Sequence, residues 1–393
     1  MSSPASTEPQ PQPVSPSEVA ALPVPFPIVG VGASAGGLEA FTELLESLPP
    51  NPGLAILFVN HLEPHHKSHL DEVLAKVTRL PIREAVEGTA VEVNHLYLIP
   101  PNTNMALTDG TLALSPRSPA RGLHMPIDHL FRSLAQVHKN RAIAVILSGG
   151  GTDGTLGFQA VKAEDGITIA QDAASARQDG MPRSAVSDGR VDYVLPPREI
   201  AEQLVRLARH PYARASAARP DGVAESGDAI QGVIALLRAQ TDVDFTHYKR
   251  STIDRRIQRR MALGNLERAA DYLEVLRTNH EELHNLYQDL LIRVTSFFRD
   301  PEAFAVLKEK VFPELVKERS ANTPLRVWVA GCSTGEEVYS LAIALLEFLG
   351  ARPEARSLKI LATDLSEPAL ERARAGGRPT MRARALARRA SAT

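Results

Sequence analysis

Between residue 27 and about residue 209 the sequence alternates short, β-rich apolar runs with stretches of helical spacing, and this alternation constrains the fold more than any other feature. The β-rich runs are rich in Val, Ile and Leu and cover residues 28–32, 54–60, 97–100, 142–148, 167–171 and 191–195. Helical spacing covers residues 38–48, 69–77, 127–138, 155–163 and 198–207. Because parallel strands need crossover connections, we predict an α/β domain built on a doubly wound, mainly parallel sheet.

A further pair of strands is predicted by an Asp-Gly turn. Asp109-Gly110 stands between Met105-Ala-Leu-Thr and Thr-Leu-Ala-Leu. Asp-Gly is a preferred two-residue hairpin turn. We therefore expect an antiparallel hairpin here, at an edge of the sheet.

The chain is long enough for two or three domains, with 393 residues of which 44% are hydrophobic. Stretches rich in Pro, Ser, Ala or Arg and poor in large apolar residues mark its arm, linker and tail. We expect six segments: a disordered arm (1–25), the α/β domain (26–210), a linker (211–228), a small helical domain (229–318), the start of a Rossmann-like domain (319–375) and a disordered tail (376–393).

The charge balance and the single cysteine exclude some functional classes. Lys and Arg number 44 and Asp and Glu 46, a formal net charge of -2, so nothing global indicates nucleic acid or an anionic membrane as a partner. Cys332 stands alone, which excludes an internal disulfide and favours a reducing compartment. No apolar stretch approaches the roughly 18 residues of a membrane span. We expect a cytoplasmic protein without membrane insertion.

The turn after the first predicted strand carries a serine between glycines. Residues 28–37 read Ile-Val-Gly-Val-Gly-Ala-Ser-Ala-Gly-Gly, so Ser34 stands at a strand-to-helix turn. This matches the G-x-S-x-G elbow, which exposes a nucleophilic hydroxyl beside the free N–H groups of a helix start. Gly30 to Ala35 also fits the dinucleotide-binding pattern G-x-G-x-x-G/A, and a merely tight turn is a third interpretation. The motif alone does not decide between them.

Residues suited to acid–base chemistry follow two further predicted strands. His61 follows residues 54–60, and Asp153 lies in Ser148-Gly-Gly-Gly-Thr-Asp-Gly after the run that begins at residue 142. The carboxyl ends of parallel strands meet at one edge of a sheet. Ser34, His61 and Asp153 are therefore candidates for nucleophile, base and the carboxylate that orients the base. A structural histidine at His61 and an N-cap of the following helix at Asp153 are the alternatives.

A cluster of histidines allows a metal site to be considered. His61, His65, His66 and His69 lie within nine residues, and histidines three or four residues apart on a helix can share an ion. Pro64 interrupts the spacing, and only Glu63 and Asp71 stand near enough to complete a ligand set. We favour a polar loop that lines the site and expect no metal.

These motifs together resemble the catalytic domain of the CheB-type chemotaxis methylesterases, over residues 27 to about 209. The resemblance rests on Gly32-Ala-Ser-Ala-Gly-Gly, on Asn60-His61 followed by Pro64, and on Gly150-Gly-Thr-Asp-Gly. It implies the following site residues: Ser34, His61 and Asp153 as the catalytic triad, with the backbone N–H groups of Ala35 and Gly150 at the oxyanion.

The same resemblance implies an activity and a partner. The activity is hydrolysis of glutamate γ-methyl esters on chemoreceptor helices, without a cofactor and in some members with deamidation of receptor glutamines. Gly150 stands where the family often has Met, which leaves a backbone donor that is held less rigidly. No phosphorylatable receiver domain precedes residue 26 in the sequence, so control by that route is not expected. A non-catalytic receptor-binding module is the chief alternative, and a dinucleotide oxidoreductase is a more distant one.

The second half carries a different pattern. Residues 327–337 read as a strand, a glycine-bounded turn and a helix, and residues 360–364 as a strand that ends in an acid. This pair suits a nucleoside, and a generic mononucleotide-binding βαβ unit fits as well. With Thr-Ser-Phe-Phe-Arg upstream at 295–299, residues 230–375 resemble the CheR-type receptor methyltransferases. The resemblance implies that S-adenosylmethionine is bound by Thr295, Arg299, Glu337 and Asp364.

Two further expectations concern this half. After residue 375 the sequence has no β-rich run, so we expect a truncated methyltransferase that is inactive and partly unfolded, with a working enzyme as the alternative. Residues 247–261 predict a helix with a strongly basic side. A solvated face, a docking surface for acidic receptor helices and, least favoured, a nucleic-acid contact are its three interpretations.

Overall fold

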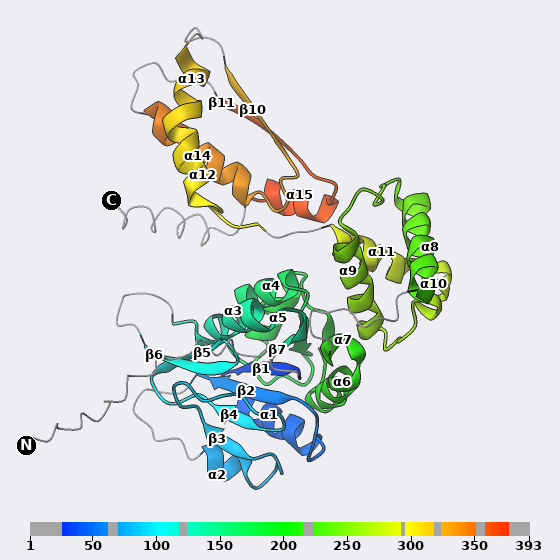
Figure 1. The fold of residues 1–393 in the computed structure, drawn as a ribbon. Coiled ribbons are helices and arrows are strands. Elements are labelled where there is room, and N and C mark those ends of the chain that lie inside the picture. The colour runs from blue at the N-terminus through cyan, green and yellow to red at the C-terminus, as the bar shows by residue number, and fades with distance from the viewer. Residues whose placement is uncertain are drawn as a thin grey trace, which may run out of the picture. The chain divides into compact units, whose positions relative to one another are not determined.

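The computed structural model describes residues 26–61, 70–117, 124–214, 224–291, 295–317, 324–350 and 358–376. The chain forms two compact units, residues 1–221 and 222–393 (Figure 1). The arm predicted over residues 1–25 lies outside the described residues, and so does the predicted tail after Gly376.

A seven-stranded, wholly parallel sheet forms the centre of the first unit, in the order β3-β4-β2-β1-β7-β8-β9 (Figure 1). Its strands are β1 (Ile28–Ala33), β2 (Ala55–Asn60), β3 (Ile82–Glu84), β4 (Leu96–Leu98), β7 (Ala142–Ile146), β8 (Ile167–Gln171) and β9 (Tyr193–Leu195). Every predicted strand is present, and the predicted α/β fold is confirmed. β3 is absent from the prediction because Ile-Arg-Glu carries no apolar pattern.

Helices cover both faces of this sheet (Figure 1): α1 (Gly37–Glu46), α2 (Leu70–Leu74), α3 (Pro126–His138), α4 (Thr155–Ala163), α5 (Gly180–Ser187), α6 (Pro197–Arg209) and α7 (Pro211–Arg214). On one face α1 stacks Phe41 on Phe58 of β2 and contacts α6. On the other face α3 packs on β1, where Phe131 lies against Gly30. The strand order reverses between β1 and β7, and in open α/β sheets ligands bind outside the carboxyl ends of the strands at such a switch point.

The predicted hairpin is present as β5 (Thr103–Thr108) and β6 (Thr111–Pro116), paired antiparallel. Asp109 and Gly110 both have positive φ, as a type I′ turn requires. The expected position is wrong, because the hairpin forms a separate two-stranded sheet and joins no edge of the large one. It packs on α3, whose Ser133 hydroxyl accepts a hydrogen bond from the backbone of Leu107 at 3.0 Å.

The segment predicted as a linker contains helical residues at both of its ends. α7 lies within it, and the Tyr212 hydroxyl donates to the carbonyl of Asp165 at 2.6 Å, which fastens α7 to the first unit. Helix α8 (Ala224–Thr241) begins before residue 229. The two-unit division at residues 221 and 222 falls inside the segment.

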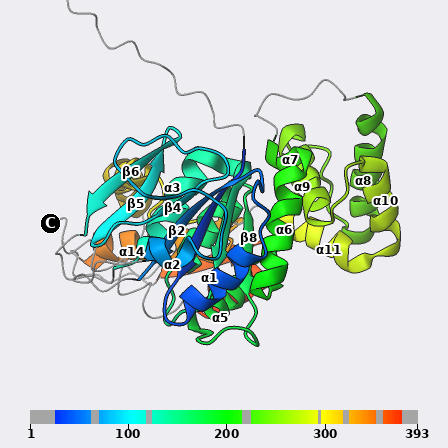
Figure 2. The ribbon, with the colours of Figure 1, turned by 90° about the horizontal axis from the view of Figure 1, so that it is seen from below.

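A cluster of four helices begins the second unit: α8, α9 (Arg250–Leu263), α10 (Ala269–Thr278) and α11 (His280–Leu290) (Figure 2). Their apolar side chains enclose one core that contains Phe245, Ile257 and Leu286. The basic side predicted for residues 247–261 is partly interior, because Arg259 is fully buried and pairs with Asp289 at 2.9 Å. Arg260 likewise binds Glu282. A solvated face is therefore the wrong interpretation for these two arginines.

The remainder of the second unit is α12 (Pro301–Val306), the π-helical segment η2 (Leu307–Val311), α13 (Phe312–Lys317), β10 (Leu325–Ala330), α14 (Glu336–Gly350), β11 (Leu358–Thr363) and α15 (Glu367–Arg374). β10 and β11 pair in parallel, and alternate residues face a small core built around Phe312 and Leu345. On the opposite face of these strands Trp328 is 70% exposed and Leu361 is 62% exposed. One face of this two-stranded sheet is thus uncovered in the described part of the chain.

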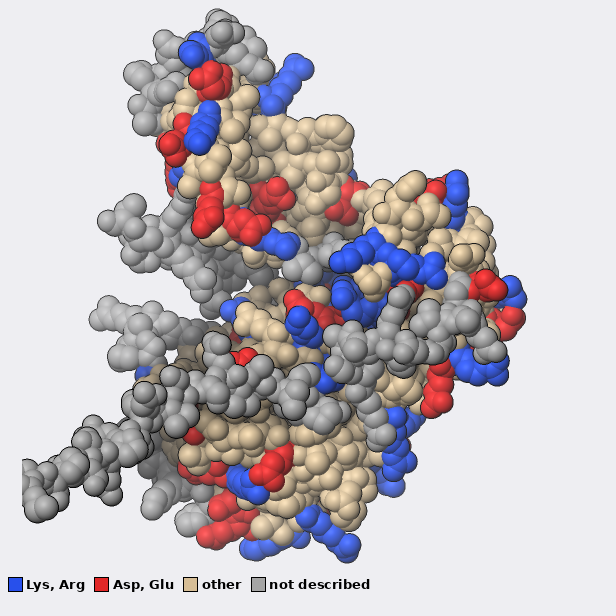
Figure 3. Space-filling model, viewed as in Figure 1, with Lys and Arg blue, Asp and Glu red and all other residues tan. Residues whose placement is uncertain are grey.

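On the face shown in Figure 3, basic and acidic side chains are interspersed over both units. This mixture agrees with the formal net charge of -2. Within the described residues, no helix has both the length and the apolar character needed to cross a membrane.

Candidate active site

Ser34 follows β1 directly and lies in the tight turn that leads into α1. Its backbone N–H donates to the carbonyl of Ser148 at 2.9 Å, and its carbonyl accepts from Gly37 at 2.8 Å. Gly36 has a φ of 73°, a left-handed conformation that favours glycine. The strand-turn-helix context that the elbow motif needs is therefore present.

Gly32 has a packing role that needs no bound phosphate. A Cβ at this position would lie 2.3 Å from Cγ2 of Ile127 in α3, so only glycine lets the helix approach β1 this closely. The end of β2, where a dinucleotide-binding protein has an acid, carries His61. Both observations favour the elbow over the dinucleotide loop.

His61 and Asp153 form a direct pair. The ring Nε2 of His61 lies 2.9 Å from Oδ2 of Asp153. The Asp153 side chain is 2% exposed, whereas that of His61 is 32% exposed. With Nε2–H donating to the carboxylate, Nδ1 is the nitrogen left to accept a proton.

Asp153 is held by backbone donors as well as by the histidine. Its Oδ1 accepts from the N–H groups of Asp128 and Gly154, both at 2.9 Å, and its Oδ2 accepts from Ile127 at 3.0 Å. Ile127 and Asp128 begin α3, so this carboxylate lies at the N-terminus of α3. The alternative of a side-chain N-cap on the following helix is wrong, since α4 has Gly154 at its N-cap and no side-chain cap bond.

The register of the sheet makes Ser34 and His61 neighbours. Ala33 pairs with Asn60 across the parallel strands β1 and β2, and His61 donates its backbone N–H to the carbonyl of Ala33 at 3.3 Å. Adjacent strands lie about 4.8 Å apart, so the two side chains start from neighbouring positions. Among the described residues no hydrogen bond joins the Ser34 hydroxyl to His61. The His–Asp link is thus formed, and the serine is adjacent to it.

The two backbone groups predicted to hold the oxyanion lie at this edge of the sheet. No backbone acceptor for the N–H of Ala35 or of Gly150 occurs in the described part of the chain. Gly149, rather than Gly150, contacts the serine turn: a Cβ on it would lie 2.8 Å from the Cβ of Ser34. The N–H of Gly149 donates to the carbonyl of Gln178 at 2.9 Å, so it is not free to bind an oxyanion.

Ser148 connects the turn of Ser34 to the loop before α5. It is fully buried, and its hydroxyl lies 2.9 Å from the carbonyl of Ala35 and accepts from Gln178 at 2.9 Å. Its own N–H donates to Oε1 of Gln171 at 2.8 Å. The sequence predicted no role for Gln171 or Gln178. Gln171 could have been found as a polar residue at the end of a buried strand, β8.

A second buried carboxyl belongs to Asp128, whose backbone N–H binds Asp153. Asp128 is 4% exposed, and its Oδ1 accepts from the N–H of Gly157 at 2.7 Å. Burial, reinforced by the Asp153 charge, raises the pKa of Asp128 from 3.8 to about 6. Sequence reasoning did not find Asp128, because an acid in the first turn of a helix is common and indicates no special site.

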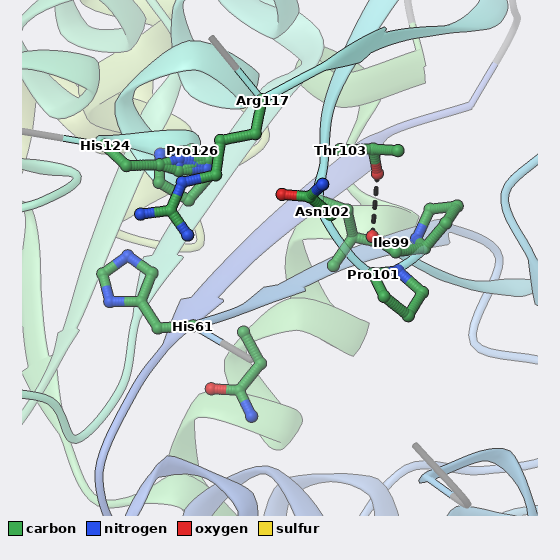
Figure 4. Close-up of a pocket in the computed structure, with 10 residues that line it drawn as sticks. His61, Ile99, Pro101, Asn102, Thr103, Arg117, His124 and Pro126 are labelled. Atoms are coloured by element: carbon green, nitrogen blue, oxygen red, sulfur yellow. Dashed lines mark hydrogen bonds between the residues drawn. The ribbon is translucent and has the colours of Figure 1, made fainter. Parts of the chain in front are cut away.

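A pocket of about 260 Å³ opens beside His61 (Figure 4). It is lined by residues from the end of β2, the segment after β4, the hairpin and the start of α3: Asn60, His61, Ile99, Pro100, Pro101, Asn102, Thr103, Arg117, His124 and Pro126. Sequence reasoning found none of these except Asn60 and His61, since nothing in the chain order links the hairpin to β2.

The predicted histidine cluster is only partly visible. His65, His66 and His69 lie outside the described residues. Among the residues that are described, no group of three or more His, Cys, Asp or Glu side chains could hold a metal ion.

The residues predicted to bind S-adenosylmethionine lie in the second unit. Asp364 follows β11, and its carboxylate accepts from the N–H groups of Ser333 at 2.8 Å and Ser366 at 2.7 Å. Glu337 lies in the first turn of α14, which follows the turn after β10. Burial and the charges of Asp364 and Glu337 raise the pKa of the Cys332 thiol in that turn. Gly331 in that turn has a φ of 69° and open space where a Cβ would stand.

The loop that carries Thr295 and Arg299 reaches the same helix. The backbone N–H of Phe298 donates to the Ser340 hydroxyl at 2.9 Å, which attaches the loop to α14 one turn beyond Glu337. Backbone space at Gly331 and two acids beside it fit the chemistry of a nucleoside with a sulfonium group.

Comparison with known proteins characterises both halves. The model of the CheB methylesterase family matches residues 29–204. The all-alpha domain of CheR methyltransferases matches residues 228–291, and their SAM-binding domain matches residues 293–392. The crystal structure of the Thermotoga maritima CheB methylesterase catalytic domain aligns with 47% of this chain and 100% of its own, at 32% identity and a TM-score of 0.44.

Individual relatives match different shares of the chain. A Leptospira interrogans protein with the provisional name protein-glutamate methylesterase/protein-glutamine glutaminase is 33% identical over 45% of this chain and 92% of its own length. Protein-glutamate methylesterase/protein-glutamine glutaminase 3 of Burkholderia orbicola is 38% identical over 45% of this chain and 52% of its own. An uncharacterised 104.1 kDa Rhodobacter capsulatus protein is 39% identical over 77% of this chain, which spans 34% of that protein.

The first unit is thus a doubly wound α/β protein with hydrolase-type side chains at the carboxyl edge of its sheet. The chain belongs to the CheB methylesterase family, and CheR methyltransferase domains follow the esterase domain. Both resemblances inferred from the motifs are confirmed.

Proposed function

We propose that residues 26–210 act as a chemotaxis protein-glutamate methylesterase on chemoreceptor helices, and that the same site deamidates receptor glutamines. The observation that carries the proposal is the 2.9 Å pairing of His61 with Asp153 beside the turn of Ser34. The names of the Leptospira and Burkholderia relatives support the substrate class. The single cysteine, Cys332, supports a cytoplasmic location.

In this proposal Ser34 Oγ attacks the ester carbonyl carbon while His61 Nδ1 takes its proton. Asp153 keeps the ring oriented and stabilises its protonated form. The backbone N–H groups of Ala35 and Gly150 hold the oxyanion, and the C–OCH₃ bond then breaks as His61 returns the proton to methanol.

Hydrolysis of the acyl-serine completes the cycle. Water gives a proton to His61 and attacks the acyl carbon, which releases the glutamate carboxylate and restores the Ser34 hydroxyl. A glutamine amide would follow the same course with ammonia as the leaving group. No step needs a metal or a cofactor.

Methanol release from methylated receptor fragments tests the proposal. Ser34→Ala should reduce turnover by at least about 10³-fold, since loss of a nucleophile removes the covalent path. Receptor binding should persist, and Ser187→Ala, at an exposed serine of α5, is the matched control. Full turnover by the Ser34 variant would refute the proposal. Receptor binding by the unmodified chain without any methanol release would favour a non-catalytic binding module.

For the second unit we propose S-adenosylmethionine binding by Thr295, Arg299, Glu337 and Asp364, without methyl transfer by this chain. The open space at Gly331 supports the cofactor site. Among the described residues this domain has a two-stranded sheet with one uncovered face, and this supports the lack of turnover because so small a sheet does not hold a site rigidly.

Calorimetric titration with S-adenosylmethionine tests this second proposal. Asp364→Ala should weaken binding, and Asp271→Ala, at an exposed position of α10, should not. Robust methyl transfer from the labelled cofactor to receptor would refute the proposed inactivity.

A further inference from the structure

The pocket beside His61 has an unusual charge composition. Its cationic or protonatable lining residues are His61, Arg117 and His124, and none of its ten described lining residues is an acid. In Figure 4 the guanidinium of Arg117 and the rings of His61 and His124 border the same space. No ion pair of the Arg117 side chain occurs among the described residues, whereas the nearby carboxylate of Asp153 is already bound to His61 and three backbone groups.

The hairpin fixes the position of Arg117. Its backbone N–H donates to the carbonyl of Asn102 at 3.0 Å, which closes the base of the β5–β6 hairpin at the pocket. Asn102 has a positive φ, and the Thr103 hydroxyl donates to the carbonyl of Pro100 at 2.8 Å, so the rim is an ordered turn. Ile99, Pro100 and Pro101 supply an apolar wall on the same rim.

We propose that this pocket receives the carboxylate side chain of a glutamate or aspartate of the substrate helix, close to the methyl ester that Ser34 attacks. Arg117 binds the carboxylate, and the apolar rim packs on its aliphatic stem. The proposal rests on the proposed esterase function, and it assigns Arg117 as a specificity-determining residue rather than a catalytic one.

Size and chemistry both favour a single carboxylate side chain. The volume of about 260 Å³ lies below the range of roughly 300–1,000 Å³ typical of small-molecule sites, and suits one side chain. A planar guanidinium matches a carboxylate with two parallel hydrogen bonds. On a receptor helix, residues three or four positions apart are neighbours at about 5–6 Å, so an acid one turn from the ester reaches a pocket that borders the base.

His124 gives the pocket a second, measurable property. Burial lowers the pKa of His124, the positive charge of Arg117 and the proximity of His61 lower it further, and Asp153 opposes them. A bound carboxylate would offset the charge of Arg117 and raise the pKa of His124 again. Binding of the acidic segment should therefore take up a proton and strengthen as the pH falls.

A paired-substrate experiment tests the proposal. Two methylated receptor fragments are compared that differ only in Glu or Gln one helical turn from the ester. Arg117→Gln should raise KM for the acidic fragment by about two- to fivefold with little change in kcat, as expected for a charge-assisted contact of an exposed arginine. KM for the glutamine fragment should stay unchanged. Arg79→Gln makes the same charge change at an exposed residue that precedes the amino end of β3, whereas the pocket lies at the carboxyl ends of the strands. This control variant should affect neither fragment.

A binding measurement separates failure of the pocket from failure of the esterase. In the full-length Ser34→Ala protein, the ring proton signals of His124 are titrated with pH in the presence of each fragment. The acidic fragment should raise the pKa of His124 and the glutamine fragment should not, whether or not the natural chain turns over. An Arg117→Gln effect that is equal for both fragments, or a pKa of His124 that the acidic fragment leaves unchanged, would overturn the proposal. Absence of methanol release with a raised pKa would refute only the esterase.

Discussion

Neutralising the buried carboxyl of Asp128 should stabilise the protein at neutral pH. Asp128 is 4% exposed, and burial raises its pKa from 3.8 to about 6. The Asp128 carboxyl therefore binds a proton more tightly in the native protein than in the unfolded protein. The stability it contributes is fully present below a pH of about 3.8 and is lost as the pH rises through about 6.

The size of the effect follows from the two pKa values. They differ by about 2, and each unit is worth about 1.36 kcal/mol, so ionisation of Asp128 costs up to about 3 kcal/mol of folding free energy above pH 6. Asp128→Asn copies the shape and charge of the protonated acid, and its side-chain oxygen can still accept from Gly157. The variant should gain up to about 3 kcal/mol at pH 7.5 and almost nothing at pH 4.

Hydrogen exchange of peptides that span α3 and α4 measures this gain. Fluorescence is unsuitable, since the single tryptophan, Trp328, lies in the second unit. Asp71→Asn, at an exposed acid of α2, is the control and should show no such pH dependence. A variant less stable than the natural protein at pH 7.5, or a difference that does not vary between pH 4 and 7.5, would show that ionisation of Asp128 does not destabilise the fold.

Three other changes probe the packing of the site. Asp153→Asn should lower kcat by about 10⁴-fold, because an amide no longer fixes the tautomer of His61, and steady-state kinetics measures this loss. The variant should also lower the free energy of unfolding by about 1–3 kcal/mol, because backbone donors lose their acceptor, and a denaturant melt measures this change. Gly32→Ala should cost about 1–3 kcal/mol or more, since its Cβ would lie 2.3 Å from Ile127, and a lowered melting temperature would show it. Ser148→Ala should leave the carbonyl of Ala35 without its donor at 2.9 Å and reduce kcat more than it raises KM; an unchanged kcat would contradict this.

The sequence allowed the sheet and the pairing of His61 with Asp153 to be predicted because both depend on strand ends. Apolar runs located the strands, and parallel topology brings their carboxyl ends to one edge. The partners of Asp153 were not predictable in the same way. Two of its three backbone donors, Ile127 and Asp128, lie in the first turn of α3, 26 and 25 residues earlier in the chain, so they are defined only by the folded packing.

Charge patterns were less informative than apolar patterns. Arg259 and Arg260 appear in the sequence as part of one basic side, yet they are neutralised by Asp289 and Glu282 of α11. Likewise, Arg117 and His124 line one pocket with His61, although Arg117 follows the hairpin, His124 precedes α3 and His61 follows β2. Such pairings join distant segments, and a one-dimensional pattern does not encode them.

Covalent labelling tests whether Ser34 is an activated nucleophile. An alkyl fluorophosphonate reacts with a serine that a neighbouring base activates, and peptide mass spectrometry identifies the serine that carries the adduct. We expect a single adduct on Ser34 in the full-length chain, and its loss when His61→Gln removes the base. An unlabelled Ser34, an adduct on another serine, or undiminished labelling of the His61 variant would contradict the proposed mechanism.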